Sequence, residues 1–114
     1  MIKRFKEMKV ESKNMRGGVG DCATVHHVNP EELPHGRLFG TITIEEGNSI
    51  GFHEHHNEVE YYLIVSGEGV VSEKDGDKTV TSGDLVITGN GEGHAIRNEK
   101  KDPLVFIALI LFTD

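Results

Sequence analysis

The chain has 114 residues, which is room for one domain. Twelve basic side chains against 19 acidic ones leave a formal net charge of −7, and this balance argues against a nucleic-acid-binding protein. The longest apolar run, 104–112, is about half of what a membrane-spanning helix needs, and the N-terminus lacks the apolar stretch of a signal peptide. We therefore expect a cytoplasmic protein with no nucleic-acid or membrane partner.

Short apolar and β-branched segments, separated by turns that contain glycine, recur along the chain and predict strands. In chain order these segments lie at 22–28, 37–44, 59–65, 69–74, 78–81, 84–88, 94–98 and 104–112. The segment 37–44 alternates with period two, so Leu38, Ile42 and Ile44 share one face, and Arg37 and Phe39 share the other. No segment carries a sustained helical period. The sequence predicts an all-β domain of about 8 to 10 short strands, arranged as a sandwich or barrel.

Local signals subdivide the chain further. The pair Asp75-Gly76 predicts a β-hairpin with a type I′ turn, which requires positive φ at both central residues. Residues 1–20 show weak local preference and contain a glycine-rich joint at 16–20. We expect residues 1–36 to form an N-terminal arm and the first strands, packed on a barrel or on a dimer partner. Residues 37–114 should form the barrel core, with the whole chain as one domain.

Three of the seven histidines lie within residues 53–56. On a strand, His53 and His55 point the same way, about 6.5 to 7 Å apart along the chain, so both imidazoles can reach one ion. His56 should point elsewhere. For a His-x-His pair alone, a solvated polar turn is an equally good interpretation.

Two more side chains extend this pattern. Glu60 follows a predicted turn at 56–58 and can bring a carboxylate to the same point, and His94 opens another short strand after the glycine-rich turn 89–93. Three imidazoles and one carboxylate suit a divalent transition metal, Fe, Mn, Ni, Co, Cu or Zn, better than Ca or Mg.

The wider pattern resembles the cupin superfamily. Residues 47–67 are similar to the first conserved cupin motif, whose fixed positions are filled by Gly47, His53, His55, Glu60 and Gly67. Residues 83–98 are similar to the second motif, with Gly83, Gly91, His94 and Asn98 in place. Gly89 stands where the family usually has proline, a difference that bears on loop rigidity and not on metal binding.

The resemblance covers roughly residues 37–112 and implies a jelly-roll barrel, also called a double-stranded β-helix, with a metal near one mouth. It implies His53, His55, Glu60 and His94 as the metal ligands. An ion that prefers five or six ligands would keep one or two positions open, as a catalytic site requires.

We therefore expect a mononuclear metal-binding cupin, leaning towards an enzyme that acts on a small oxygen-rich metabolite such as an organic acid. Reactions of the dioxygenase, isomerase, lyase or decarboxylase type are all compatible with the family. Glu60 and Tyr62 are the predicted catalytic residues, and Asn98, Arg37 and Phe39 are predicted to bind substrate. A lone inward arginine would suit an anionic substrate, although an outward, salt-bridged Arg37 is the commoner arrangement. No carboxylate is marked by its spacing as a general acid.

Two alternatives remain at this point. The first is a non-catalytic module that binds or senses a small ligand, and the second is a structural protein whose barrel only dimerises. A homodimer is expected in any of the three cases, because the apolar segment 104–112 and the N-terminal arm are suited to an intersubunit sheet.

Overall fold

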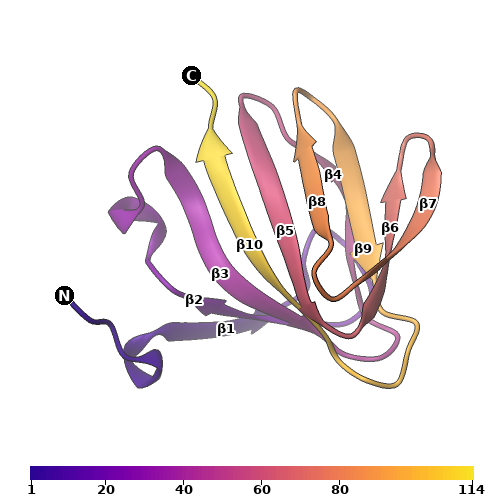
Figure 1. Cartoon of the computed structure of the whole chain (residues 1–114), viewed down its shortest axis with the longest axis horizontal. Helices are drawn as coiled ribbons and strands as arrows, with labels where there is room; N and C mark the ends of the chain where they lie inside the picture. Colours follow the sequence, from indigo (N-terminus) through magenta and orange to yellow (C-terminus); the bar gives the residue numbers. More distant parts are fainter.

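The computed structural model describes all 114 residues as ten strands and two short 3₁₀ turns (Figure 1). The strands are β1 (Lys9–Lys13), β2 (Cys22–His26), β3 (Gly36–Ile44), β4 (Ser49–Glu54), β5 (Glu58–Ser66), β6 (Glu68–Glu73), β7 (Gly76–Thr81), β8 (Leu85–Gly89), β9 (Gly93–Arg97) and β10 (Leu104–Phe112). The 3₁₀ turns are η1 (Phe5–Glu7) and η2 (Pro30–Glu32). The all-β prediction is confirmed, and no helix is long and apolar enough to cross a membrane.

The strands form two antiparallel sheets. The six-stranded sheet has the order β1-β2-β3-β10-β5-β8, and the four-stranded sheet has the order β4-β9-β6-β7. The jelly-roll prediction is confirmed, and the two sheets do not close into one continuous barrel. No hydrogen-bonded ladder joins the two sheets, so side-chain packing between their inner faces holds them together.

The core fills the space between the sheets because inward residues alternate with outward ones along each strand. In the six-stranded sheet, Phe106 of β10 lies opposite Ile42 of β3 and Ile64 of β5, and all three are fully buried. Burying each such side chain stabilises the fold by roughly 1.5 to 3 kcal/mol. The buried apolar cluster comprises Cys22, Ile42, Ile44, Ile50, Tyr62, Ile64, Val71, Val86, Ile96, Leu104, Phe106 and Ala108.

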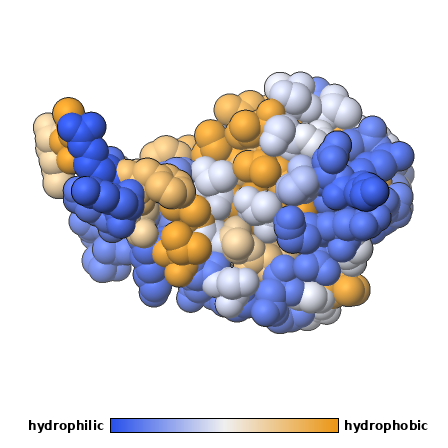
Figure 2. Space-filling view, turned by 90° about the horizontal axis from the view of Figure 1, so that it is seen from below, coloured by the Kyte–Doolittle hydropathy of each residue, from blue (hydrophilic) through white to orange (hydrophobic).

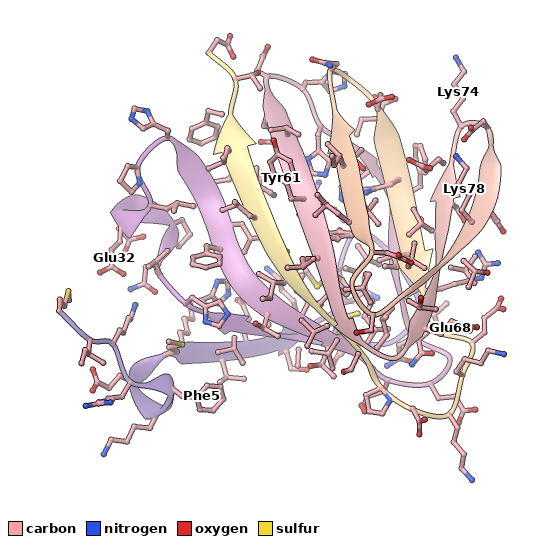
Figure 3. The ribbon with its side chains drawn as sticks, in the orientation of Figure 1. Phe5, Glu32, Tyr61, Glu68, Lys74 and Lys78 are labelled. Atoms are coloured by element: carbon pink, nitrogen blue, oxygen red, sulfur yellow. The ribbon has the colours of Figure 1, made fainter.

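The predicted hairpin is present between β6 and β7, but its turn differs from the expected one. Glu73 pairs with Gly76, so Lys74 and Asp75 are the two turn residues. Only Gly76 has positive φ, at 118°, which excludes the predicted type I′ turn. Lys78 closes the turn from β7 (Figure 3), since its Nζ lies 3.0 Å from an Asp75 carboxylate oxygen and 3.1 Å from one of Glu73.

The N-terminal segment extends the larger sheet. Strand β2 pairs with β3, and β1 pairs with β2, so residues 9–26 pack directly on the rest of the chain. The loop between β1 and β2 crosses to the other sheet, where the Gly51 amide donates to the Met15 carbonyl at 3.1 Å. The first residues are different: Phe5 is exposed (Figure 3), and the N-terminal end stands away from the body of the molecule (Figure 2).

Candidate metal centre

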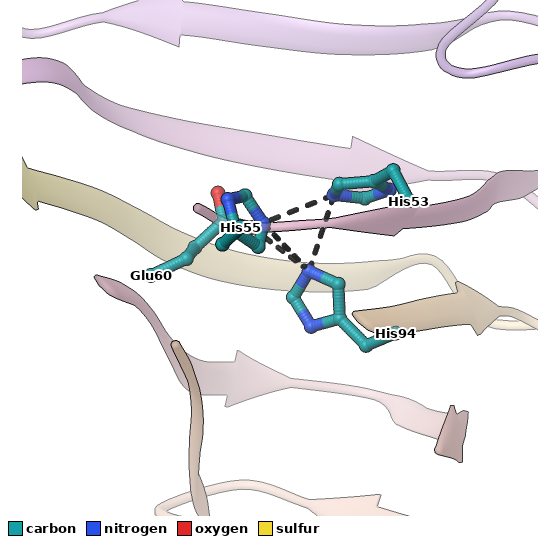
Figure 4. Close-up of side chains that lie close together, drawn as sticks. All are labelled: His53, His55, Glu60 and His94. Carbon is teal, nitrogen blue, oxygen red and sulfur yellow. Dashed lines mark hydrogen bonds and ion pairs between the residues drawn. The ribbon is translucent and has the colours of Figure 1, made fainter. Parts of the chain in front are cut away.

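The four predicted ligands come from three segments of the chain and meet between the two sheets (Figure 4). His53 on β4 and His94 on β9 are direct partners in the four-stranded sheet. Glu60 projects towards them from β5 of the opposite sheet. Strand β4 ends at Glu54, so His55 lies just beyond it, where its amide donates to the Glu92 carbonyl at 3.0 Å and its carbonyl accepts the Gly91 amide at 2.8 Å.

The ligand atoms converge closely, all lying within 4.8 Å of one another. The Nε2 atom of His94 is 3.2 Å from Nε2 of both His53 and His55. The Oε1 atom of Glu60 is 2.9 Å from Nε2 of His55 and of His94, and 3.8 Å from Nε2 of His53. Glu60, His55 and His94 are each at most 3% exposed.

The outer ring nitrogens show how the cluster is oriented. Nδ1 of His53 donates to the Gly51 carbonyl at 2.8 Å, and Nδ1 of His55 donates to a Glu58 carboxylate oxygen at 2.5 Å. Carbonyl and ionised carboxylate oxygens only accept, so these two rings carry their proton on Nδ1 and direct the Nε2 lone pair inwards. Nδ1 of His94 is paired with the Thr88 hydroxyl at 2.8 Å.

This arrangement fits a metal ion. Imidazole lone pairs and a carboxylate oxygen repel one another at such short separations unless a cation lies among them or a proton is taken up. Ligand histidines that bond through the other nitrogen to a carbonyl or carboxylate are the usual supporting arrangement in protein metal sites. Nitrogen and oxygen donors of this kind suit a divalent transition metal.

Electrostatics keep both neighbouring carboxyl groups ionised. Burial acts to raise the pKa of Glu60, but hydrogen bonds with His53, His55 and His94 hold that pKa far below its ordinary value. At Glu58, the hydrogen bonds from Arg37 are the largest cause of a pKa lowered to about 2, and the bond from His55 acts in the same direction. Burial acts to lower the pKa of His55, but its bonds to these two carboxylates raise it.

Glu58 is a candidate site residue that the sequence did not reveal. The sequence predicts a turn at 56–58, whereas β5 begins at Glu58, with Asn57 before it in a left-handed conformation at φ 61°. The carboxylate of Glu58 accepts Nε and Nη2 of Arg37, both at 2.8 Å, as well as Nδ1 of His55. Period-two alternation was the available signal, because Glu58 shares the inward face of the strand with Glu60 and Tyr62.

A cavity of about 410 Å³ adjoins the ligand cluster. Three of the ligands, His53, His55 and Glu60, form part of its wall. Its apolar wall residues are Met15, Pro30, Leu38, Ile42, Ile50 and Ile110. Its remaining polar wall residues are Glu11, Lys13, Asn14, Arg16, Thr24, His26, Arg37 and Tyr62.

The structure brings two of the other predicted site residues to this cavity. Tyr62 is buried and stacks on the His94 ring, with centroids 4.8 Å apart and planes inclined by 15°. Arg37 lines the cavity and is also salt-bridged, so both interpretations of this arginine hold in part. His56 points away from the cluster as predicted and pairs with Glu54 at the surface.

Phe39 and Asn98 are not among the residues that line the cavity, and their role in substrate binding stays a prediction. Phe39 lies against the His27 ring, with centroids 5.1 Å apart. The Asn98 amide nitrogen donates to the carbonyls of Ile44 at 3.0 Å and Asp102 at 2.9 Å, so this buried side chain organises the loops between strands.

Comparison with known proteins agrees with this geometry. The model of the cupin domain family matches residues 40–110, more than half of the chain. This chain belongs to the cupin superfamily. The resemblance predicted from the two histidine-containing motifs is thereby confirmed.

A sequence match and a structure match both come from Thermotoga maritima. An oxalate-binding protein is 36% identical over 113 residues, which cover 97% of this chain and 93% of the relative. The crystal structure of a "predicted oxalate decarboxylase" is 35% identical and superimposes with a TM-score of 0.91, covering 98% of this cupin and 99% of that chain. A sugar phosphate isomerase from Silicibacter pomeroyi, 15% identical with a TM-score of 0.76 over 95% of this chain and 73% of its own, shares the fold.

Proposed function

We propose that this cupin binds one divalent transition metal through His53, His55, Glu60 and His94, and that the metal-loaded cavity binds oxalate or another small dicarboxylate. The observation that carries the proposal is the buried meeting point of three imidazole nitrogens and one carboxylate oxygen in the wall of a cavity. The names given to the Thermotoga maritima matches, which cover nearly the full length of this chain, support oxalate as the first ligand to test.

The charge balance of the cavity favours an anion. A divalent ion beside the Glu60 carboxylate and neutral imidazoles leaves one positive charge uncompensated at the ligand cluster. Arg37 adds a cation in the wall, although its guanidinium is bonded to Glu58. The apolar wall residues Leu38, Ile42 and Ile50 limit the water around a bound ligand, which strengthens these electrostatic attractions.

An enzyme is the favoured form of this function. When bound, the metal supplies Lewis-acid chemistry and, if it is Fe, Mn or Cu, redox chemistry. Burial and the nearby Glu60 carboxylate raise the pKa of Tyr62 well above 10, so its phenol stays protonated. A protonated phenol in the cavity wall can donate a hydrogen bond or a proton to a carboxylate oxygen of the ligand. Glu60 provides the charge that balances the ion, and Glu58 holds the ring of His55.

Metal analysis and titration test the binding step. Protein purified without a histidine tag should contain about one equivalent of a transition metal, measured by mass spectrometry. Isothermal titration of the loaded protein should detect oxalate binding, and His94→Ala should lose both the metal and the binding. Oxalate binding of equal strength by chelator-treated protein would contradict the proposal.

Incubation of the metal-loaded protein with oxalate separates an enzyme from a binding module. Consumption under nitrogen, with formate and carbon dioxide as products, would mean a decarboxylase. Consumption only in air would mean an oxygen-dependent enzyme. Reversible binding without consumption, for oxalate and for a panel of other small acids, would establish the non-catalytic module instead. The name of one relative, an oxalate-binding protein, is what favours this second candidate.

We also propose that the chain forms a homodimer through the outer face of the six-stranded sheet. Leu63 and Val65 of β5 and Leu85 and Ile87 of the neighbouring β8 are 43% to 55% exposed on that face. Light scattering during size-exclusion chromatography should give the mass of a dimer, and Ile87→Asp should shift it to a monomer. A monomeric wild-type protein would contradict the proposal. The cytoplasmic location stays a prediction.

A further inference from the structure

The turn between β1 and β2 holds an arginine in an unusual backbone conformation. Arg16 has φ 56°, in the left-handed region, which only a few per cent of non-glycine residues adopt. Such residues persist where the surrounding contacts determine the backbone, and they concentrate at functional sites. Arg16 is therefore a position at which to look for a role beyond the turn itself.

The contacts that hold this turn are main-chain contacts with β4. The Gly51 amide donates to the Met15 carbonyl, and the Ser49 amide donates to the Val19 carbonyl at 2.9 Å. A Cβ atom at Gly51 would lie 2.0 Å from the Arg16 carbonyl oxygen, so only glycine allows this approach. The Gly51 carbonyl also accepts Nδ1 of His53. The turn thus lies directly against the strand that carries one of the predicted metal ligands.

The charge of Arg16 has no partner in the chain. Other cations of the cavity wall are engaged, since Arg37 is bonded to Glu58 and Lys13 is paired with Glu11 at 3.7 Å. Arg16 is exposed, lines the cavity, and makes neither a side-chain hydrogen bond nor an ion pair.

We propose that Arg16 is a second anchor for the ligand, and that its guanidinium binds the carboxylate that faces away from the metal. This inference rests on the proposed dicarboxylate function. A guanidinium presents a planar fork of donors that matches the two oxygens of a carboxylate. A cavity with a metal on one side and an unpaired guanidinium on another favours acids with two carboxylates over monocarboxylates, which can satisfy only one of the two anchors.

The test compares oxalate with acetate in isothermal titrations of the metal-loaded protein. Arg16→Asn is the main variant, because asparagine tolerates positive φ and so removes the charge with little added backbone strain. It should weaken oxalate binding about 10- to 100-fold, as expected for the loss of a charge-assisted contact, and acetate binding less than about 3-fold. Arg16→Lys keeps the charge without the fork and should fall between the wild type and Arg16→Asn for oxalate.

Two controls make the result specific. Metal content should stay at the wild-type level in both Arg16 variants, and Arg4→Gln, which removes one positive charge from the N-terminal arm, should bind oxalate like the wild type. Oxalate affinity of Arg16→Asn within about 2-fold of the wild type would overturn the second anchor and leave the proposed function intact. Equal losses for oxalate and acetate would overturn the selectivity. Failure of the loaded wild-type protein to bind any carboxylate would overturn the proposed function itself.

Discussion

Replacing Glu58 tests whether a residue that would not touch the metal controls the metal affinity of the site and the stability of the fold. Its two carboxylate oxygens accept three hydrogen bonds, two from Arg37 and one from Nδ1 of His55. Glutamine offers a single acceptor oxygen, and its amide group would face a donor. Glu58→Gln therefore loses at least one of these charge-assisted bonds and frees either the His55 ring or the guanidinium.

The magnitude follows from the burial of each partner. The Glu58 side chain is 11% exposed, whereas that of Arg37 is 39% exposed and can be hydrated once released. A hydrogen bond to a charged group contributes about 1.5 to 3 kcal/mol, and the hydration of Arg37 places the expected loss near the lower end, at about 2 kcal/mol. For a domain of this size, that loss lowers the melting temperature by about 8 °C. Metal affinity should fall about 10- to 100-fold, as is usual when the partner of a ligand histidine is lost.

The pH dependence gives an independent check on the cause. Because the pKa of Glu58 is lowered from an ordinary 4.5 to about 2 in the folded protein, its ionised form contributes stability above pH 4.5. That contribution is lost as the pH falls through the folded value. In metal-free protein, the difference in melting temperature between the wild type and Glu58→Gln should be full at neutral pH and should vanish as the pH approaches 2.

Thermal unfolding with chelator present measures the loss of stability, and competition with a chelator of known affinity measures the loss of metal affinity. Glu54→Gln is the matched control, because Glu54 is exposed and pairs only with His56 at the surface. A Glu58→Gln protein that binds metal within about 2-fold of the wild type would refute the argument that Glu58 orients His55.

Three further predictions concern the same region. Single changes His53→Ala, His55→Ala and His94→Ala should each strip most of the metal, measured by mass spectrometry, whereas His56→Ala should leave it in place; the reverse pattern would contradict the ligand assignment. Tyr62→Phe keeps the ring that stacks on His94 but removes the hydroxyl, so metal content should be unchanged while the oxalate affinity or turnover falls about 10-fold. If oxalate affinity and turnover both stay at the wild-type level, Tyr62 does not contact the ligand. Gly51→Ala should lower the free energy of unfolding by about 1 to 3 kcal/mol, because the new methyl group would clash with the Arg16 carbonyl oxygen. An unchanged melting temperature in calorimetry would mean that the turn between β1 and β2 can move away from Gly51 without cost.

Much of the fold and the ligand cluster could be predicted from the sequence because both depend on local patterns. Alternation along 37–44 predicts which side chains of β3 reach the core, and Ile42 and Ile44 are buried accordingly. The spacing of His53 and His55, together with their match to a family motif, predicted ligands that the structure does bring together with Glu60 and His94. Side-chain direction on a strand has a period of two, so it needs no knowledge of the partner strand.

The remaining features depend on contacts between segments far apart in the chain. Nothing in residues 53–60 alone indicates that Arg37 on β3 will bond Glu58 on β5, because that contact exists only after both strands have paired with β10. Alternation also could not decide whether the sheets close into a barrel, since closure depends on ladder bonds between edge strands.

The same distinction applies to the surroundings of Phe39, Asn98 and Arg16. The contact of Phe39 with the His27 ring and the hydrogen bond from Asn98 to the carbonyl of Ile44 form only in the folded chain. Arg16 lies in a segment of weak local preference, and only its approach to Gly51 of the other sheet brings it to the cavity. The sequence by itself therefore determined the strands and the candidate metal ligands, because their patterns are local. The tertiary structure decided which side chains surround the ligands, because hydrogen bonds and close approaches between sheets join residues that no short-range pattern connects.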